Sequence, residues 1–190
     1  MVITQNDVGN DIKMITDSLS DKNRPLIAPV AALKIAMLWP GLCLLGYLSA
    51  FAWIISTYVP VYDVYGDPVS IFWDYSFGFA SLSVTVIFGL AIGAGMYGPA
   101  LFYLTIPETI RDQSLIISHM KKLAKKLGVF FILCNLALAL AVCFYSELMV
   151  ASPFLLMFSF IIMQGILSAE MTRYGIAPLM KKMVSLARKI

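Results

Sequence analysis

Four long segments of this chain are apolar and almost free of charge. They run from Ile35 to Val59, from Tyr75 to Leu104, from Gly128 to Ser146 and from Pro153 to Thr172. A helix needs about 20 mostly apolar residues to cross the hydrocarbon layer of a bilayer, and each segment is close to that length or longer. Composition agrees, because 60% of the residues are hydrophobic and only 13% are charged. The sequence therefore predicts an all-α polytopic membrane protein with four transmembrane helices.

The connections between these segments predict two helical hairpins. The third and fourth segments are separated only by Glu147 to Ser152, and the first two by Pro60 to Asp74, which we call the acidic loop. We expect three regions: an amphipathic N-terminal segment (1–34), a four-helix domain (35–175) with a basic amphipathic loop (107–127), and a basic amphipathic C-terminal helix (176–190).

The charged residues are sorted between the two sides of this pattern. All fourteen Lys and Arg lie before the first segment, between the second and third, or from the end of the fourth onward. The charged residues of the acidic loop and of the second hairpin turn are all acids: Asp63, Asp67, Asp74 and Glu147. Because basic residues gather on the cytoplasmic side of a membrane, the pattern predicts a multi-pass membrane protein with both termini in the cytoplasm.

Three further stretches repeat apolar residues with helical spacing, at 8–19, 116–127 and 179–190. Basic amphipathic helices beside transmembrane segments usually lie in the headgroup plane. We therefore expect contact with membrane lipid, and the alternative is that the three pack together as a small cytoplasmic subdomain. The same basic runs beside apolar segments indicate lipid headgroups and topology rather than nucleic acid.

The second apolar segment contains glycines at helix-packing spacing. Gly89 and Gly93 form a GxxxG pattern, and Gly95 and Gly98 add a second small pair. Helix backbones approach closely where side chains are missing. The pattern indicates packing inside the monomer, with homodimerisation and a hinge at Pro99 as the alternatives.

Polar residues inside the apolar segments are costly and are candidates for function. They are Asn135, Gln164 and Glu170, with Arg173 three residues after Glu170. Residues at that spacing meet on one helix face, so Glu170 and Arg173 predict an ion pair near the cytoplasmic interface, with a gating or transport charge as the alternative. Asn135 and Gln164 predict a hydrogen bond between the third and fourth segments.

The sequence offers no route to catalysis. Its one histidine, His119, excludes a histidine-based metal site, and the chain contains no phosphate-binding loop, zinc-protease motif or nucleophile elbow. We expect no cofactor, no metal and no enzymatic activity.

Both ends of the chain resemble those of a known family. The opening Met1 to Gln5 (MVITQ) leads into a polar stretch, and the fourth segment closes on Glu170-Met171-Thr172-Arg173-Tyr174-Gly175. This resembles TraS, the inner-membrane entry-exclusion family of F-like conjugative plasmids, which has a comparable E-x-[ST]-R-Y-G stretch. The resemblance implies that the chain blocks redundant plasmid transfer into its host by recognising a TraG-type protein of the donor cell.

The surface that would meet such a partner is left open by the sequence. In the acidic loop the candidate contacts are Asp63, Tyr65, Asp67, Trp73 and Asp74. Tyrosine and tryptophan anchor protein interfaces, although they also form the interfacial belt of membrane proteins. The cytoplasmic segments offer a larger surface. A subunit or regulator of a larger membrane complex, and a small channel or transporter, remain as alternative functions.

Overall fold

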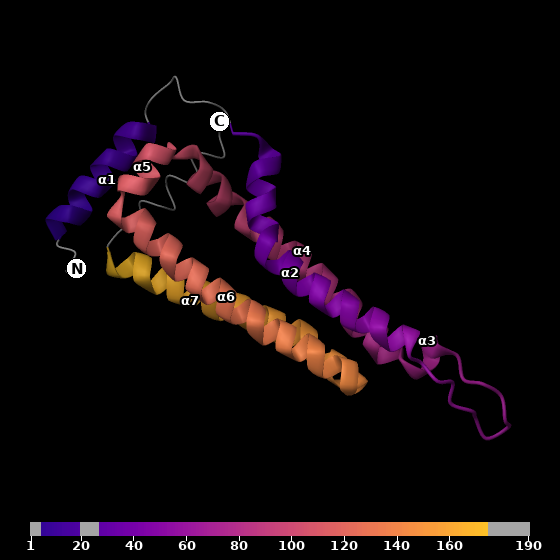
Figure 1. Cartoon of the computed structure of the whole chain (residues 1–190). Helices are drawn as coiled ribbons and strands as arrows, with labels where there is room; N and C mark the ends of the chain where they lie inside the picture. The colour runs from indigo at the N-terminus through magenta and orange to yellow at the C-terminus, as the bar shows by residue number, and fades with distance from the viewer. Residues whose placement is uncertain (1–4, 20–26, 175–190) are drawn as a thin grey trace. The chain divides into compact units, whose positions relative to one another are not determined.

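A computed structural model describes residues 5–19 and 27–174 (Figure 1). Within these residues the fold is all-α, apart from an isolated β-bridge between Tyr62 and Pro68. The elements in chain order are α1 (Gln5–Leu19), α2 (Pro29–Ser56), α3 (Ile71–Asp74), α4 (Ser76–Thr105), α5 (Glu108–Gln113), α6 (Leu115–Phe144), the 3₁₀ helix η1 (Ser146–Ala151) and α7 (Ser152–Arg173).

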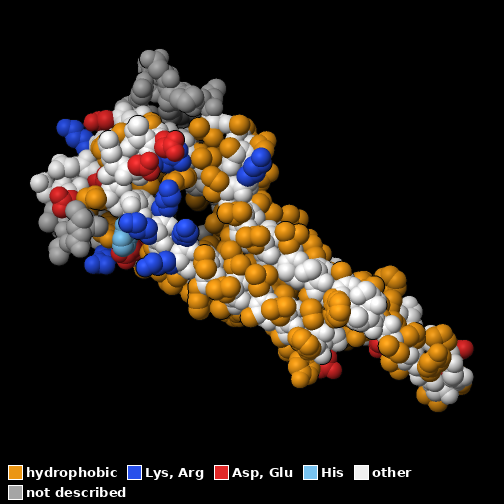
Figure 2. All heavy atoms as spheres, viewed as in Figure 1, with side chains coloured by type: hydrophobic (Ala, Val, Ile, Leu, Met, Phe, Trp, Pro, Cys, Tyr) orange, Lys and Arg blue, Asp and Glu red, His pale blue; other side chains and the backbone are white. Residues whose placement is uncertain are grey.

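Four of these helices are long and apolar enough to cross a membrane. They are α2, α4, α6, and η1 with α7, which together run Ser146–Arg173. The predicted fold class is therefore confirmed. Large apolar side chains also point outward along them, as Leu45, Leu140 and Phe158 are each more than half exposed. Figure 2 shows hydrophobic side chains covering the long helices, and such a surface needs lipid rather than water around it.

Prolines do not end the first two long helices. Pro40 lies inside α2 and Pro99 inside α4, which continues to Thr105. Pro99 therefore does not end α4, and the hinge alternative stays a prediction. Apolar residues continue past each proline, and neighbouring helices and local adjustments re-satisfy the freed carbonyls, so that transmembrane helices tolerate proline.

The third long helix starts earlier than predicted. The amphipathic stretch from Ile116 to Leu127 is the first part of α6, which runs without interruption into the predicted third span. Between Leu115 and Phe144 the only helix-weakening residue is Gly128, and one glycine costs a helix about 1 kcal/mol. The predicted C-terminal helix and the basic residues Lys22, Arg24, Lys181, Lys182, Arg188 and Lys189 lie outside the described residues.

The chain divides into two compact units. Residues 38–92 and 129–160 form what we call the bundle unit. The described residues of 1–37, 93–128 and 161–190 form what we call the polar unit. We describe each unit by itself.

The bundle unit is a bundle of four helical segments. Its core gathers Tyr47, Phe51 and Ile54 of α2, Ala139 and Val142 of α6, and Met149 of η1. From α4, Phe79 meets Phe51 edge-on with ring centroids 4.8 Å apart. Lipid removes most of the hydrophobic driving force between such helices, so close packing and hydrogen bonds must hold them together.

The polar unit packs α1 onto the ends of longer helices. Ile15 of α1 is buried with Phe102 of α4 and Ile106, which follows α4. Ala32 and Ala36 of α2 are fully buried close to Ala100 of α4. The described N-terminal helix is therefore packed against other helices of the polar unit.

Two glycines of α4 lie against α2 side chains. In the bundle unit, a Cβ on Gly89 would stand 2.6 Å from Cδ1 and 2.9 Å from Cγ of Leu44. In the polar unit, a Cβ on Gly93 would collide with Sδ of Met37. Gly95 has open space where a Cβ would be, and Gly98 is buried. The glycine pattern thus serves contacts inside the monomer.

We predict that Gly89→Leu destabilises the protein in detergent by about 1–3 kcal/mol, because Leu44 has a short side chain and cannot move aside. Gly93→Leu should cost less, since the flexible Met37 side chain can swing away. Gly95→Leu is the matched control and should leave the unfolding temperature unchanged. Equal stability of the Gly89 and Gly95 variants would contradict the packing described here.

Candidate functional site

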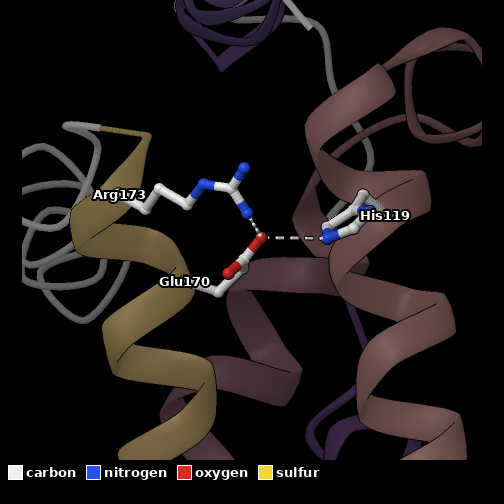
Figure 3. Close-up of polar contacts among 3 residues, drawn as sticks. All are labelled: His119, Glu170 and Arg173. Atoms are coloured by element: carbon white, nitrogen blue, oxygen red, sulfur yellow. Dashed lines mark hydrogen bonds and ion pairs between the residues drawn. The ribbon is translucent and has the colours of Figure 1, made fainter. Parts of the chain in front are cut away.

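One carboxylate joins α6 to α7 in the polar unit. Oε1 of Glu170 lies 3.2 Å from Nε2 of His119 on α6 and 3.3 Å from Nη1 of Arg173, one turn further along α7 (Figure 3). The Tyr174 ring meets the His119 ring edge-on, with centroids 5.8 Å apart. The predicted Glu170–Arg173 pair is present, and His119 is a partner that the sequence did not suggest.

Exposure decides what this cluster can do. The Glu170 side chain is 20% exposed, whereas His119 is 42% and Arg173 73% exposed. An exposed ion pair at i, i+3 stabilises a helix by only about 0.3–0.5 kcal/mol. The more useful contact is the one between helices, in which His119 donates through Nε2–H and holds α7 to α6. The cluster therefore holds α6 and α7 together and is not a fully buried charge.

A second polar cluster lies within the bundle unit around Asn135, which is 1% exposed. The Tyr47 hydroxyl of α2 donates to Oδ1 of Asn135 at 2.9 Å. Nδ2 of Asn135 donates to the Phe131 carbonyl at 2.8 Å and to Oγ of Ser159 on α7 at 3.1 Å. One amide therefore ties three helices together and has all its polar atoms satisfied.

The predicted Asn135–Gln164 hydrogen bond is wrong. Asn135 lies opposite Ser159, and Gln164 is five residues further along α7, or about 7–8 Å at 1.5 Å per residue. Gln164 is half-buried and makes no hydrogen bond within residues 5–19 and 27–174. The partners that sequence reasoning missed, Tyr47 and Ser159, are common in such helices and carry no signal of their own.

A further side-chain hydrogen bond of the bundle unit joins α4 to α7. Oγ1 of Thr85 on α4 lies 2.8 Å from Oγ of Ser152 at the start of α7, and both residues are fully buried. Oγ1 of Thr85 also lies 2.7 Å from the Ser81 carbonyl, and Oγ of Ser152 lies 2.8 Å from the Met149 carbonyl. Since each hydroxyl has one hydrogen to donate, one of the two donates to the other hydroxyl and its partner donates to its own carbonyl. Together with the Asn135 cluster, this contact links all four helices by side-chain hydrogen bonds.

The acidic loop forms a hairpin whose turn is held by hydrogen bonds. Oδ1 of Asp63 accepts hydrogen bonds from the backbone N–H groups of Tyr65 and Asp67, at 2.8 and 2.9 Å. Gly66 has a φ of +85°, a conformation that favours glycine in such a turn. The side chains at the tip point away from this scaffold, since Val64 is 100% and Tyr65 91% exposed.

Aromatic residues fasten the base of the acidic loop. The Tyr58 hydroxyl donates to the Val69 carbonyl at 3.1 Å, and its ring meets that of Tyr75 edge-on. Desolvation and then the Asp74 carboxylate raise the pKa of Tyr58. The five predicted contact residues are all exposed: Asp63, Tyr65, Asp67, Trp73 and Asp74.

A buried acid in the polar unit was missed by sequence reasoning. Asp11 of α1 is 6% exposed, and its Oδ2 accepts hydrogen bonds from the Ser114 hydroxyl and the Ile116 N–H, each at 2.9 Å. Oγ of Ser114 accepts from the Ile117 N–H at 3.1 Å. Asp11 therefore caps the N-terminus of α6 from another helix, where the helix dipole favours a negative charge. Serine just before an apolar periodic run is the signal that could have located this helix start.

These clusters join helices to one another and shape an exposed loop. Within the described ranges, no three His, Cys, Asp or Glu side chains gather closely enough to hold a metal ion.

We predict that Asn135 and Tyr47 are coupled in stability. In a double-mutant cycle of Asn135→Leu and Tyr47→Phe, the coupling energy should be about 0.5–1.5 kcal/mol, the range of hydrogen bonds between membrane helices. Chemical unfolding in detergent would measure it. Gln164→Leu is the control and should change stability by no more than a few tenths of a kcal/mol. Strictly additive effects at Asn135 and Tyr47 would refute the coupling.

Comparison of the chain with protein-family models, with curated proteins and with solved structures finds no match in any of the three.

Proposed function

We propose that this chain is a multi-pass protein of the bacterial inner membrane that excludes redundant conjugative plasmid transfer, by recognising a TraG-type protein of the donor cell. The observation that carries the proposal is the TraS-like stretch beginning at Glu170. Glu170 and Arg173 of that stretch contact each other, and Glu170 also contacts His119 of the preceding long helix. Gly175 of the stretch and residues 1–4 of the TraS-like opening lie outside the described residues.

The use of polar residues in the long helices supports recognition over transport. In the bundle unit, the hydrogen bonds of Asn135 and Thr85 join helices and leave these groups satisfied. An ion pathway would instead need polar groups that face a shared aqueous path. The proposal therefore gives the long helices a scaffolding role and gives the activity to surfaces outside them.

The acidic loop is the surface that we assign to recognition. Its tip is held in one shape by Asp63, so that binding need not first order the turn. Tyr65 and Trp73 are the residue types that most often dominate binding energy, and both are more than 80% exposed. With three carboxylates and no Lys or Arg, the loop suits a positively charged segment of a partner.

The polar unit offers the other surface for a partner. It presents exposed charged residues on α1, α5 and the first turns of α6, such as Lys13, Asp112 and Lys121. This surface would matter if the donor protein entered the recipient cell or if a signal passed inward. Asp11 does not belong to this surface, because it is buried and accepts hydrogen bonds from Ser114 and Ile116.

The orientation follows from the charge pattern. In the described part of the chain, Lys and Arg occur only in α1, α5, the first turns of α2 and α6, and the last residue of α7. Figure 2 shows them gathered on the polar unit. By the positive-inside rule, the proposal puts these basic segments on the cytoplasmic side and the acidic loop in the periplasm.

We predict that single cysteines at Asp67 and Glu147 react with a membrane-impermeant maleimide added to intact spheroplasts. A cysteine at Lys122 should react only after the membrane is opened. The background for these variants has Cys43, Cys134 and Cys143 replaced by serine or alanine. Reaction of the Lys122 position in intact cells would overturn the proposed orientation.

For the function, we predict that a plasmid-free recipient expressing this chain receives a related F-like plasmid less often than the same strain without it. Transfer of an unrelated plasmid should be unchanged. Tyr65→Ala with Trp73→Ala should restore transfer, because these side chains have no packing role that would explain a loss by unfolding. The measurement is the number of transconjugants per donor.

The matched control is Trp53→Ala, which removes an exposed tryptophan from α2 outside the acidic loop. It should leave exclusion intact. Exclusion that survives the loop variant but is lost in variants of exposed polar-unit residues would move recognition to the polar unit. Equal transfer with and without the chain, for every F-like donor tried, would reject the proposed function in favour of a subunit of a larger membrane complex.

A further inference from the structure

Four lysines form a continuous exposed face on α6. Lys121, Lys122, Lys125 and Lys126 are all exposed, and they make two pairs at i, i+4 spacing. Residues so spaced are neighbours on a helix surface, with Cβ atoms about 5–6 Å apart. The face therefore concentrates four positive charges within two turns of one helix.

These lysines have no acidic partner in the described part of the chain. The ion pairs there join Glu170 to His119 and to Arg173. Of the described acids of the polar unit, Asp11 caps the N-terminus of α6, Glu170 pairs with His119 and Arg173, Asp7 and Asp17 belong to α1, and Glu108 and Asp112 belong to α5. The positive charge of the lysine face is thus available to a ligand.

The lysine face continues along α6 into its lipid-exposed apolar face. At 100° per residue, Lys122, Lys126, Val129, Leu133 and Leu140 fall within a sector of about 60°. The three apolar residues of this stripe are at least half exposed. Ile116, Phe131 and Asn135 lie on the opposite side of α6 and are buried.

The depth of the lysines matches a layer of phosphate groups. Val129 is the first apolar residue of the stripe. Lys126 precedes Val129 by three residues and Lys121 precedes it by eight, so the lysines lie about 4–12 Å from Val129 along the helix axis. The headgroup region is about 5–8 Å thick on each side of the hydrocarbon layer, and lysine stems reach toward it. A lipid whose acyl chain lies against Val129 and Leu133 therefore places its phosphate among these lysines.

We propose that this face of α6 is a binding site for anionic phospholipid, with acyl chains on the apolar stripe and headgroup phosphate on Lys122 and Lys126. An acidic protein segment would use only the lysines and would leave the aligned apolar stripe unexplained. If the lysines served only to set the orientation of the chain in the membrane, their charge would be enough, and they would not need to line up with the lipid-facing side of α6. The proposal is independent of plasmid exclusion and holds for the chain in any bilayer.

The test is native mass spectrometry of the full chain, delipidated in a neutral detergent and titrated with dioleoyl phosphatidylglycerol or dioleoyl phosphatidylcholine. We expect tighter binding of the phosphatidylglycerol, weakened by on the order of fivefold for each lysine removed in Lys122→Gln and Lys122→Gln with Lys126→Gln. The corresponding arginine double variant keeps the charge and should bind as the original chain does.

Lys13→Gln removes one charge from α1 and is the matched control for Lys122→Gln. An equal loss of lipid in both would show a non-specific charge effect and overturn the site. Equal binding of the two lipids would do the same. Displacement of lipid by glycerol phosphate or by polyglutamate at equal charge would assign the lysines to a free phosphate or to an acidic protein instead. Circular dichroism of each variant must match that of the original chain.

Discussion

The absence of water around the long helices is the constraint on which the rest of this structure depends. In hydrocarbon each backbone N–H and C=O must be paired within its own segment, so that each apolar stretch becomes a helix from end to end. The same solvent removes most of the hydrophobic force that would hold a soluble bundle together. What then selects one arrangement of four helices is a small set of close contacts and hydrogen bonds.

Glycine and buried polar side chains supply that selection. Gly89 and Gly93 let α2 side chains lie against the α4 backbone, and Gly46 of α2 does the same for Leu136 of α6. Asn135 and Thr85 then connect helix pairs through satisfied hydrogen bonds. Each contact contributes modestly to stability. A shift of one helix along another would break the hydrogen bonds and leave a polar group unpaired in lipid.

The polar residues outside the spans follow ordinary aqueous rules. Asp11 is buried because it satisfies the N–H and hydroxyl groups at the start of α6, and Asp63 organises a turn that leaves Tyr65 in solvent. One acid holds two parts of the polar unit together, whereas the other prepares an exposed surface. This contrast is the reason why the acidic loop is assigned to recognition.

Hydropathy alone predicts the number and type of the spanning helices, because hydropathy over about 20 residues is a local property, but it misses that α6 begins at Leu115. The sequence by itself also located the Glu170–Arg173 pair, since residues at i, i+3 meet on any helix. The folded chain alone reveals that Asn135 meets Tyr47 and Ser159 rather than Gln164, and that His119 meets Glu170. Those pairings depend on how far one helix slides and rotates against the next, and shifts of a few ångströms leave the hydropathy pattern unchanged.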